Sequence, residues 1–233
     1  MNVKVIFLMS AGMLSLTSQL AAQKQIDFGV KAGINISGLD LSPGGKLVGV
    51  TYNTRPGYHF GIYAQARRKN FALQPELLFS SQGQNFTTSN YSDLYTQLNY
   101  IALPVIVKYY LTGGLYVQAG PQVGMLAGAN GYLVQLNQGY LGVATQNDLK
   151  PYIHQFDWSF AFGAGLELPF GGSLSIRYSN GISDVNKYTL GTLPTNNQGT
   201  TITHSLSTAY ARNQVLQISL AYKLEKLKIK LAK

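Results

Sequence analysis

The 233-residue sequence contains no cysteine, which excludes a disulfide framework, thiolate chemistry and cysteine-ligated metal sites. Charged residues are also scarce, at 12%, or about half the proportion in a typical globular domain. Because apolar residues make up an ordinary 45%, the low charge does not indicate disorder, which requires high charge and few aromatic residues. The polar surface must therefore consist mainly of uncharged side chains.

Motifs of catalysis and metal binding are missing too. The three histidines, His59, His154 and His204, lack the paired spacing of metal ligands. No Gly-x-Ser-x-Gly nucleophile motif occurs in the chain. The sequence therefore predicts a non-enzymatic protein with no catalytic residue, no metal and no cofactor.

The net charge of +9 is unevenly distributed, since five Lys and one Glu lie between Lys223 and the end of the chain. We expect residues 225–233 to form a short, solvated basic tail. No Arg-rich face accompanies it, so we expect no nucleic-acid partner.

The first 23 residues have the pattern of a secretory signal peptide. Lys4 precedes an apolar stretch over residues 5–16, and Leu20-Ala21-Ala22-Gln23 follows. The stretch is too short to span a bilayer, which takes about 20 apolar residues. We therefore expect export and cleavage near Ala22 or Gln23.

The rest of the chain alternates apolar and polar residues, and this period of two predicts strands with one apolar and one polar face. Between residues 24 and 224, eight segments show the alternation: 26–37, 57–67, 71–82, 98–111, 115–127, 155–168, 173–183 and 213–224.

The connections between these segments alternate between short and long. Short turns at 68–70, 112–114 and 169–172 carry the Gly and Asn that tight hairpins need for positive φ. Long polar loops cover 38–56, 83–96, 128–154 and 184–212. This pattern predicts an all-β fold, an eight-stranded antiparallel up-and-down transmembrane β-barrel, with its short turns and both termini in the periplasm.

The polar faces decide between a membrane barrel and a soluble, lipocalin-like barrel. They are rich in Gly, Ser and Gln, whereas a water-facing surface would carry many more Lys and Glu. An eight-stranded barrel has an interior just wide enough for side chains, and charges there must pair. We expect a charge network in the lumen, formed by Lys31, Glu76, Lys108, Glu167 and Arg177.

Two further features belong to this prediction. Aromatic residues cluster near both ends of the segments, as in interfacial girdles: Phe71, Tyr109, Tyr110, Phe170 and Tyr222 at the short-turn end, and Tyr91, Tyr95, Tyr100, Tyr152, Phe156 and Trp158 at the other. Pro75, Pro104 and Pro121 lie within strands, so we expect bulges or strand ends there, because proline cannot donate to a ladder.

Five segments resemble the PorT-type outer-membrane β-barrel family of Bacteroidetes: 28–35 (FGVKAGIN), 73–83 (LQPELLFSSQG), 100–105 (YIALPV), 116–121 (YVQAGP) and 162–167 (FGAGLE). The resemblance spans nearly all of the chain after the signal and implies an outer-membrane location and an up-and-down barrel. It implies little about activity.

The sequence thus favours a non-enzymatic outer-membrane barrel in the cell envelope, in contact with lipid and lipopolysaccharide, with a structural role or an interaction role through its long loops. Protein partners would bind those loops. Two alternatives stay open: a narrow porin-like channel or transporter, and a barrel enzyme acting on lipid or peptide. A soluble, lipocalin-like periplasmic barrel is a further, less favoured alternative.

Overall fold

The computed structural model describes residues 26–41, 50–88, 94–137, 140–146, 149–187 and 210–224. Nearly all of them belong to strands, and within these ranges no helix is long and apolar enough to cross a membrane. The strands are β1 (Ile26–Leu41), β2 (Val50–Arg68), β3 (Phe71–Thr88), β4 (Leu94–Tyr110), β5 (Leu115–Asn137), β6 (Tyr140–Gln146), β7 (Phe156–Glu167), β8 (Gly172–Gly181) and β9 (Ala211–Lys223). Two short 3₁₀ turns, η1 (Thr112–Gly114) and η2 (Lys150–Tyr152), complete the elements.

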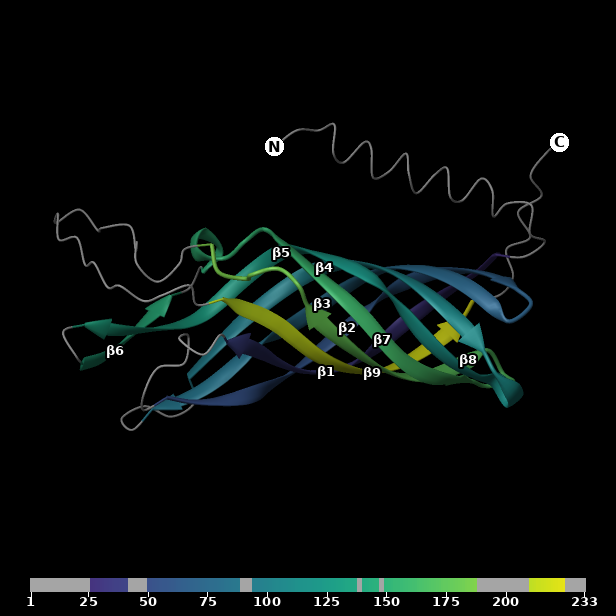
Figure 1. Ribbon diagram of the computed structural model, residues 1–233, viewed down its shortest axis with the longest axis horizontal. Coiled ribbons are helices and arrows are strands. Elements are labelled where there is room, and N and C mark those ends of the chain that lie inside the picture. Colours follow the sequence, from purple (N-terminus) through teal and green to yellow (C-terminus); the bar gives the residue numbers. More distant parts are fainter. Residues whose placement is uncertain are drawn as a thin grey trace, which may run out of the picture.

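Eight of these strands form the closed wall of a barrel (Figure 1). Each pairs antiparallel with its neighbours in the order β1-β2-β3-β4-β5-β7-β8-β9, and β9 pairs with β1 to close the wall. The prediction of an eight-stranded antiparallel up-and-down transmembrane barrel is confirmed.

The strands extend further into the long connections than the alternation predicted. β5 continues to Asn137 and pairs with β6 over Gly131–Gln146 and Asn137–Tyr140. This hairpin, at the left of Figure 1, lies within residues 128–154, for which only a loop was expected. The predicted segment ends at residue 127, so the continuation of β5 and its pairing with β6 were not predicted.

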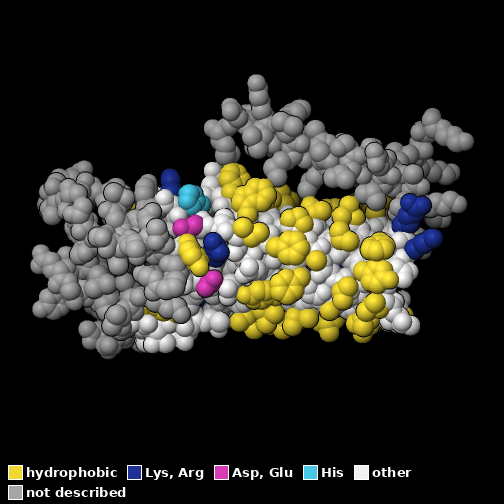
Figure 2. Space-filling view, viewed as in Figure 1, with side chains coloured by type: hydrophobic (Ala, Val, Ile, Leu, Met, Phe, Trp, Pro, Cys, Tyr) yellow, Lys and Arg dark blue, Asp and Glu magenta, His cyan; other side chains and the backbone are white. Residues whose placement is uncertain are grey.

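The wall separates the two kinds of side chain as the alternation predicted. The outward face is apolar and includes Val30, Ile34, Phe60, Ile62, Leu103, Val117, Phe162, Ile176 and Leu220, each at least 40% exposed. The inward face is polar and includes Lys31, Asn35, His59, Gln65, Glu76, Lys108, Gln118, Arg177 and Gln217, each below 5% exposed. Figure 2 shows apolar side chains over much of the visible face of the wall, from its middle towards the short turns, and we call this surface the apolar belt. Only a medium of hydrocarbon makes such a belt favourable over so much of a surface.

The three short turns connect β2 to β3, β4 to β5 and β7 to β8, as predicted. Gly113, Gly114 and Gly171 have the positive φ that was expected of them. In the first turn, however, the residue with positive φ is Lys69, at 52°, and not the neighbouring Asn70. A lysine in this conformation is unusual, because only Gly, Asn and Asp adopt it readily.

The expectation that the in-strand prolines mark bulges or strand ends is wrong. The register is continuous through Pro75, Pro104 and Pro121, and the two register shifts lie elsewhere, between Thr54 and His59 and between Asn99 and Tyr100. Each proline is paired with a residue of the next strand of the wall: Pro75 with Val105, Pro104 with Gln122 and Pro121 with Phe160. On its other side, towards the strand before it in the chain, each proline has no paired residue, although the register resumes unchanged beyond it. An antiparallel residue bonds only one neighbour through its N–H, so each proline interrupts a single ladder.

The predicted girdles are correct only in part. Phe71, Tyr109, Phe170 and Tyr222 point outward near the short turns, and Trp158 points outward at the opposite end. Tyr100 and Tyr110 are each 1% exposed and point into the lumen, so their assignment to the girdles is wrong. Tyr91 lies outside the described residues, as do His204, the expected signal peptide (1–23) and the expected basic tail (225–233).

Candidate functional site

The centre of the lumen holds a buried ion cluster. Glu76 of β3 accepts two hydrogen bonds from Arg177 of β8, at 2.7 and 3.0 Å, and two from Lys31 of β1, at 3.2 and 3.3 Å. Gln74 donates a further bond to Glu76 at 2.7 Å, and Arg177 donates to Gln118 of β5 at 3.2 Å. The carboxylate therefore has donors on every side, which is the condition under which burial of an ion pair is tolerated.

The Glu76–Arg177 pair spans the full width of the lumen. β3 and β8 are four steps apart in a wall of eight strands, so they face each other across the axis. Nearer the long loops, Asn213 of β9 donates to Tyr100 of β4, the strand opposite, at 3.4 Å. At the short-turn end, Arg67 of β2 donates to Glu167 of β7, again the strand opposite, at 3.0 Å. Side chains therefore cross the lumen at three levels.

Lys108 lies in the lumen beside this cluster but bonds no carboxylate among the described residues. Its ammonium donates to Gln65 at 3.3 Å and lies 4.3 Å from the centre of the Tyr116 ring. Tyr110 donates to the same Gln65 oxygen at 3.3 Å. The central lumen thus contains three cations, Lys31, Lys108 and Arg177, against one carboxylate.

Glu167 is the one predicted network residue that lies apart from the centre. It sits at the short-turn rim, where it pairs with Arg67 and with Lys223, and Lys223 also lies 3.7 Å from Asp27. These groups are partly exposed, with 42% of the Arg67 side chain and 24% of the Lys223 side chain accessible. The structure therefore brings together Lys31, Glu76 and Arg177, with Lys108 close by, and places Glu167 in a separate rim cluster.

A second buried polar group surrounds His59. Its Nδ1 lies 2.8 Å from the oxygen of Asn35, which only accepts, so Nδ1 carries the proton and donates. Its Nε2 lies 2.9 Å from the hydroxyl of Ser219. The ring reaches Ser219 by passing over Gly33, where a Cβ would lie 2.7 Å from His59 Cε1. Ser, His and Asn stand in the order of a catalytic triad, but Ser219 is 1% exposed and has no access to substrate in this conformation.

The long-loop end of the lumen is covered by an apolar cluster. Leu98 and Tyr100 of β4 and Ala129 of β5 pack against Leu149 and Val185, which come from segments that follow β6 and β8. Backbone bonds attach these segments to the rim: the Leu149 N–H donates to the Ala129 carbonyl, and the Val185 N–H donates to Ala211, both at 2.8 Å. The lumen is therefore closed by packed side chains at this end.

The sequence identified the charged lumen residues but not their uncharged partners. Asn35, Gln65, Gln118, Ser219 and Asn213 hold the network together. The alternation could have identified these residues as lumen-facing, because each lies on the polar face of its segment. Within the described residues, no group of three or more His, Asp or Glu side chains could hold a metal ion.

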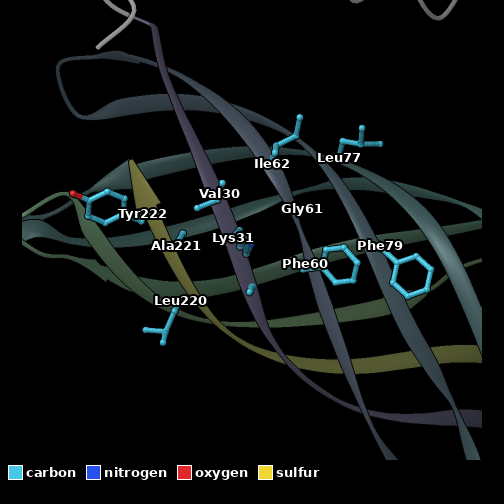
Figure 3. Close-up of a pocket in the computed structure, with 11 residues that line it drawn as sticks. Val30, Lys31, Phe60, Gly61, Ile62, Leu77, Phe79, Leu220, Ala221 and Tyr222 are labelled. Carbon is cyan, nitrogen blue, oxygen red and sulfur yellow. The ribbon is translucent and has the colours of Figure 1, made fainter. Parts of the chain in front are cut away.

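The outer wall carries a shallow depression of about 700 Å³ across β9, β1, β2 and β3. In Figure 3, Phe60, Ile62, Leu77 and Phe79 point outward on one side of it and Leu220 and Tyr222 on the other. The Lys31 side chain belongs to the lumen, where it bonds Glu76. The depression is therefore a feature of the lipid-facing surface and does not open into the ion cluster.

A protein-family model described as outer membrane protein beta-barrel domain matches residues 18–187 of the chain. No curated protein shows significant sequence similarity to it.

Three solved outer-membrane proteins are similar to the chain at low sequence identity. Neisserial surface protein A has 12% sequence identity to this chain and a TM-score of 0.46, and the match covers 84% of this chain and 97% of the neisserial chain. OprG from Pseudomonas aeruginosa has 12% identity and a TM-score of 0.45, covering 87% and 97%. Ail of Yersinia pestis, solved with the heparin analogue sucrose octasulfate, has 9% identity and a TM-score of 0.42, covering 86% and 99%.

Proposed function

Because the chain belongs to the family of outer membrane protein beta-barrel domains, we propose that it is a closed, non-enzymatic barrel that presents its long loops outside the cell. In this proposal the short turns lie in the periplasm, as is usual for outer-membrane barrels. Residues 1–23 act as the export signal. The proposal includes membership of the PorT-type branch of Bacteroidetes, which is supported by the five motifs that resemble that branch.

The observation that carries the proposal is the crossing of the lumen by side-chain bonds between opposite strands. The Glu76–Arg177 pair blocks the middle, and the apolar cluster around Leu98 and Leu149 covers the long-loop end. Water and solutes could pass only if these contacts separated. An open state would therefore require the ion pair and the apolar cluster to separate together.

A narrow channel or transporter is therefore the weaker alternative. An enzyme is weaker still, because in the described part of the chain the one group with the arrangement of a triad, at His59, is enclosed by the wall. What remains exposed for function is the lipid-facing belt and the long-loop end. We propose lipid and lipopolysaccharide as the contacts of the belt, and protein partners for the loops, with no role for nucleic acid.

The absence of cysteine makes the proposed orientation directly testable. Thr112→Cys places a single thiol at a short turn, and Gln155→Cys places one at the long-loop end, and both positions are exposed. On intact cells, a membrane-impermeant maleimide is expected to label Gln155→Cys and to leave Thr112→Cys unlabelled until the outer membrane is permeabilised. Labelling of Thr112→Cys alone on intact cells would contradict the orientation.

The non-enzymatic role is tested separately with a fluorophosphonate probe for activated serines. No reaction is expected at Ser219 in the folded, detergent-solubilised protein. Labelling that disappears in Ser219→Ala would replace this proposal with the enzyme alternative.

A further inference from the structure

Arg68 is a cation on the lipid-facing side of the wall. Along β2 the side chains alternate, so Ala66 and Arg68 point outward while Arg67 points inward, where its guanidinium lies 3.6 Å from the centre of the Tyr110 ring. Arg68 pairs in register with Phe71, which is outward and 59% exposed. Neither Arg68 nor the adjacent turn residue Lys69 bonds a carboxylate within the described part of the chain.

An apolar groove begins directly beside these two cations. Ala66 of β2, Leu73 of β3 and Val107 of β4 form one row across the wall, since Ala66 pairs with Leu73 and Leu73 pairs with Val107. Together with Phe71, Arg68 and Lys69 they line a cavity of about 420 Å³. Figure 2 shows Lys and Arg side chains at this short-turn end, where the apolar belt stops.

The position of Arg68 fixes the depth of this groove in the membrane. A cation on the lipid face costs about 2–4 kcal/mol at the midplane of the bilayer but only about 0–1 kcal/mol near an interface. The neighbouring rings of Phe71 and Tyr109 have their centres 4.9 Å apart, and both point outward, as interfacial aromatic residues do. Arg68 and Lys69 therefore stand at the level of the lipid headgroups, with the groove below them at the level of the acyl chains.

We propose that this groove binds one anionic phospholipid of the periplasmic leaflet. The lipid phosphate lies between Arg68 and Lys69, and one acyl chain lies along Ala66, Leu73 and Val107. The charge complementarity selects the headgroup, because arginine and lysine donate strong hydrogen bonds to phosphate. The assignment to the periplasmic leaflet rests on the orientation proposed above, but the binding itself does not.

The test uses purified full-length barrel in detergent, with bound lipid counted by native mass spectrometry during titration with phosphatidylglycerol or phosphatidylcholine. The wild type is expected to bind one phosphatidylglycerol in preference to phosphatidylcholine. Arg68→Gln combined with Lys69→Asn is expected to reduce that affinity about 10- to 30-fold, since each basic residue near anionic lipid contributes about 1 kcal/mol and 1.4 kcal/mol is a factor of ten. Asn is chosen at position 69 because it tolerates the positive φ of this turn.

The matched control is Lys150→Gln combined with Lys187→Gln, which removes two exposed charges from the opposite end and is expected to leave the preference unchanged. Ala66→Phe fills the groove with both cations intact and is expected to weaken both lipids equally. Three results would overturn the proposal. The control pair could lose as much affinity for phosphatidylglycerol as the Arg68/Lys69 pair, the wild type could show no headgroup preference, or millimolar inorganic phosphate could displace the lipid. None of these results depends on whether the lumen conducts, so the two proposals can fail separately.

Discussion

Replacing Glu76 by Gln removes the only carboxylate of the central cluster while keeping the shape of the side chain. Lys31 and Arg177 then lose the charge that receives four of their hydrogen bonds. The side chains of all three residues are at most 3% exposed, so water cannot replace the carboxylate. Removing one partner of a buried pair costs about 3–5 kcal/mol because the other charge stays buried and uncompensated. Here two cations are left, and we expect a loss at the upper end of that range.

The free energy of unfolding can be measured by reversible urea titration in lipid vesicles, followed by the fluorescence of Trp158, the only tryptophan. Trp158 is 46% exposed on the outer wall, so its emission reports insertion into lipid. We expect Glu76→Gln to lower this free energy by about 3–5 kcal/mol. A double-mutant cycle with Arg177→Met isolates the direct pair, and a coupling of at least about 2 kcal/mol is expected across it.

A loss below about 1 kcal/mol for Glu76→Gln, comparable to an exposed pair, would refute the reasoning. The matched control is Arg67→Gln at the short-turn rim, where 42% of the side chain is exposed. That pair also joins opposite strands, but solvent screens it, and we expect its loss to cost about 1 kcal/mol or less. If both variants lost the same free energy, burial would not be the cause.

Three further predictions use the same unfolding assay. Lys108→Met removes the lumen cation that bonds no described carboxylate, so we expect the free energy of unfolding to stay unchanged or to rise by about 1–2 kcal/mol. A loss of more than about 2 kcal/mol would show that the Lys108 charge is fully compensated by its surroundings. Gly33→Ala is expected to cost at least about 2 kcal/mol, since the new Cβ would collide with the Ile218 carbonyl oxygen and lie 2.7 Å from the His59 ring. The loss should exceed that of Gly113→Ala, where nothing lies within 4 Å and only the positive φ opposes the change; equal losses would exclude close packing as the cause. Leu220→Arg puts a charge on the lipid face and is expected to cost about 2 kcal/mol or more in vesicles, whereas a neutral result would mean that the belt does not face hydrocarbon.

The alternation predicted which side chains point inward, but it did not predict their depth. Lys31, Glu76, Lys108, Glu167 and Arg177 all lie on the polar faces of their segments, and all five side chains point into the lumen or its rim. Their heights along the axis depend on the register between strands, which no single segment encodes. Glu167 is at the rim for that reason, because it pairs with Ser173 next to the β7–β8 turn.

The misassigned tyrosines show the limit of reasoning from residue type. Tyr100 and Tyr110 were placed in the girdles because they lie near strand ends, yet Tyr110 shares its face with Lys108 and must point inward. The inward position is made possible by small neighbours, as when Tyr63 lies over Gly29 and Tyr116 over Gly165. Alternation was the better guide than aromatic character, since a side chain cannot leave the face that the pleat gives it.

The prolines and the β5–β6 hairpin were mispredicted for different physical reasons. The continuous register through Pro104 reflects the one-sided bonding of antiparallel residues, which a general rule against prolines in strands does not consider. The hairpin lies in a stretch that was assigned to a long polar loop, because the predicted segment before it ends at residue 127.

The central claim is that side chains bridging opposite strands keep the lumen closed. Single-channel recording in planar lipid bilayers, with the wild-type barrel reconstituted at low density in about 1 M salt, tests it most directly. We expect a quiet baseline from the wild type, and the same quiet baseline when Glu76 and Arg177 alone are replaced by Ala, because the apolar cluster around Leu98 and Leu149 still covers the long-loop end. Steady, reproducible conductance steps from the wild type itself would contradict the claim.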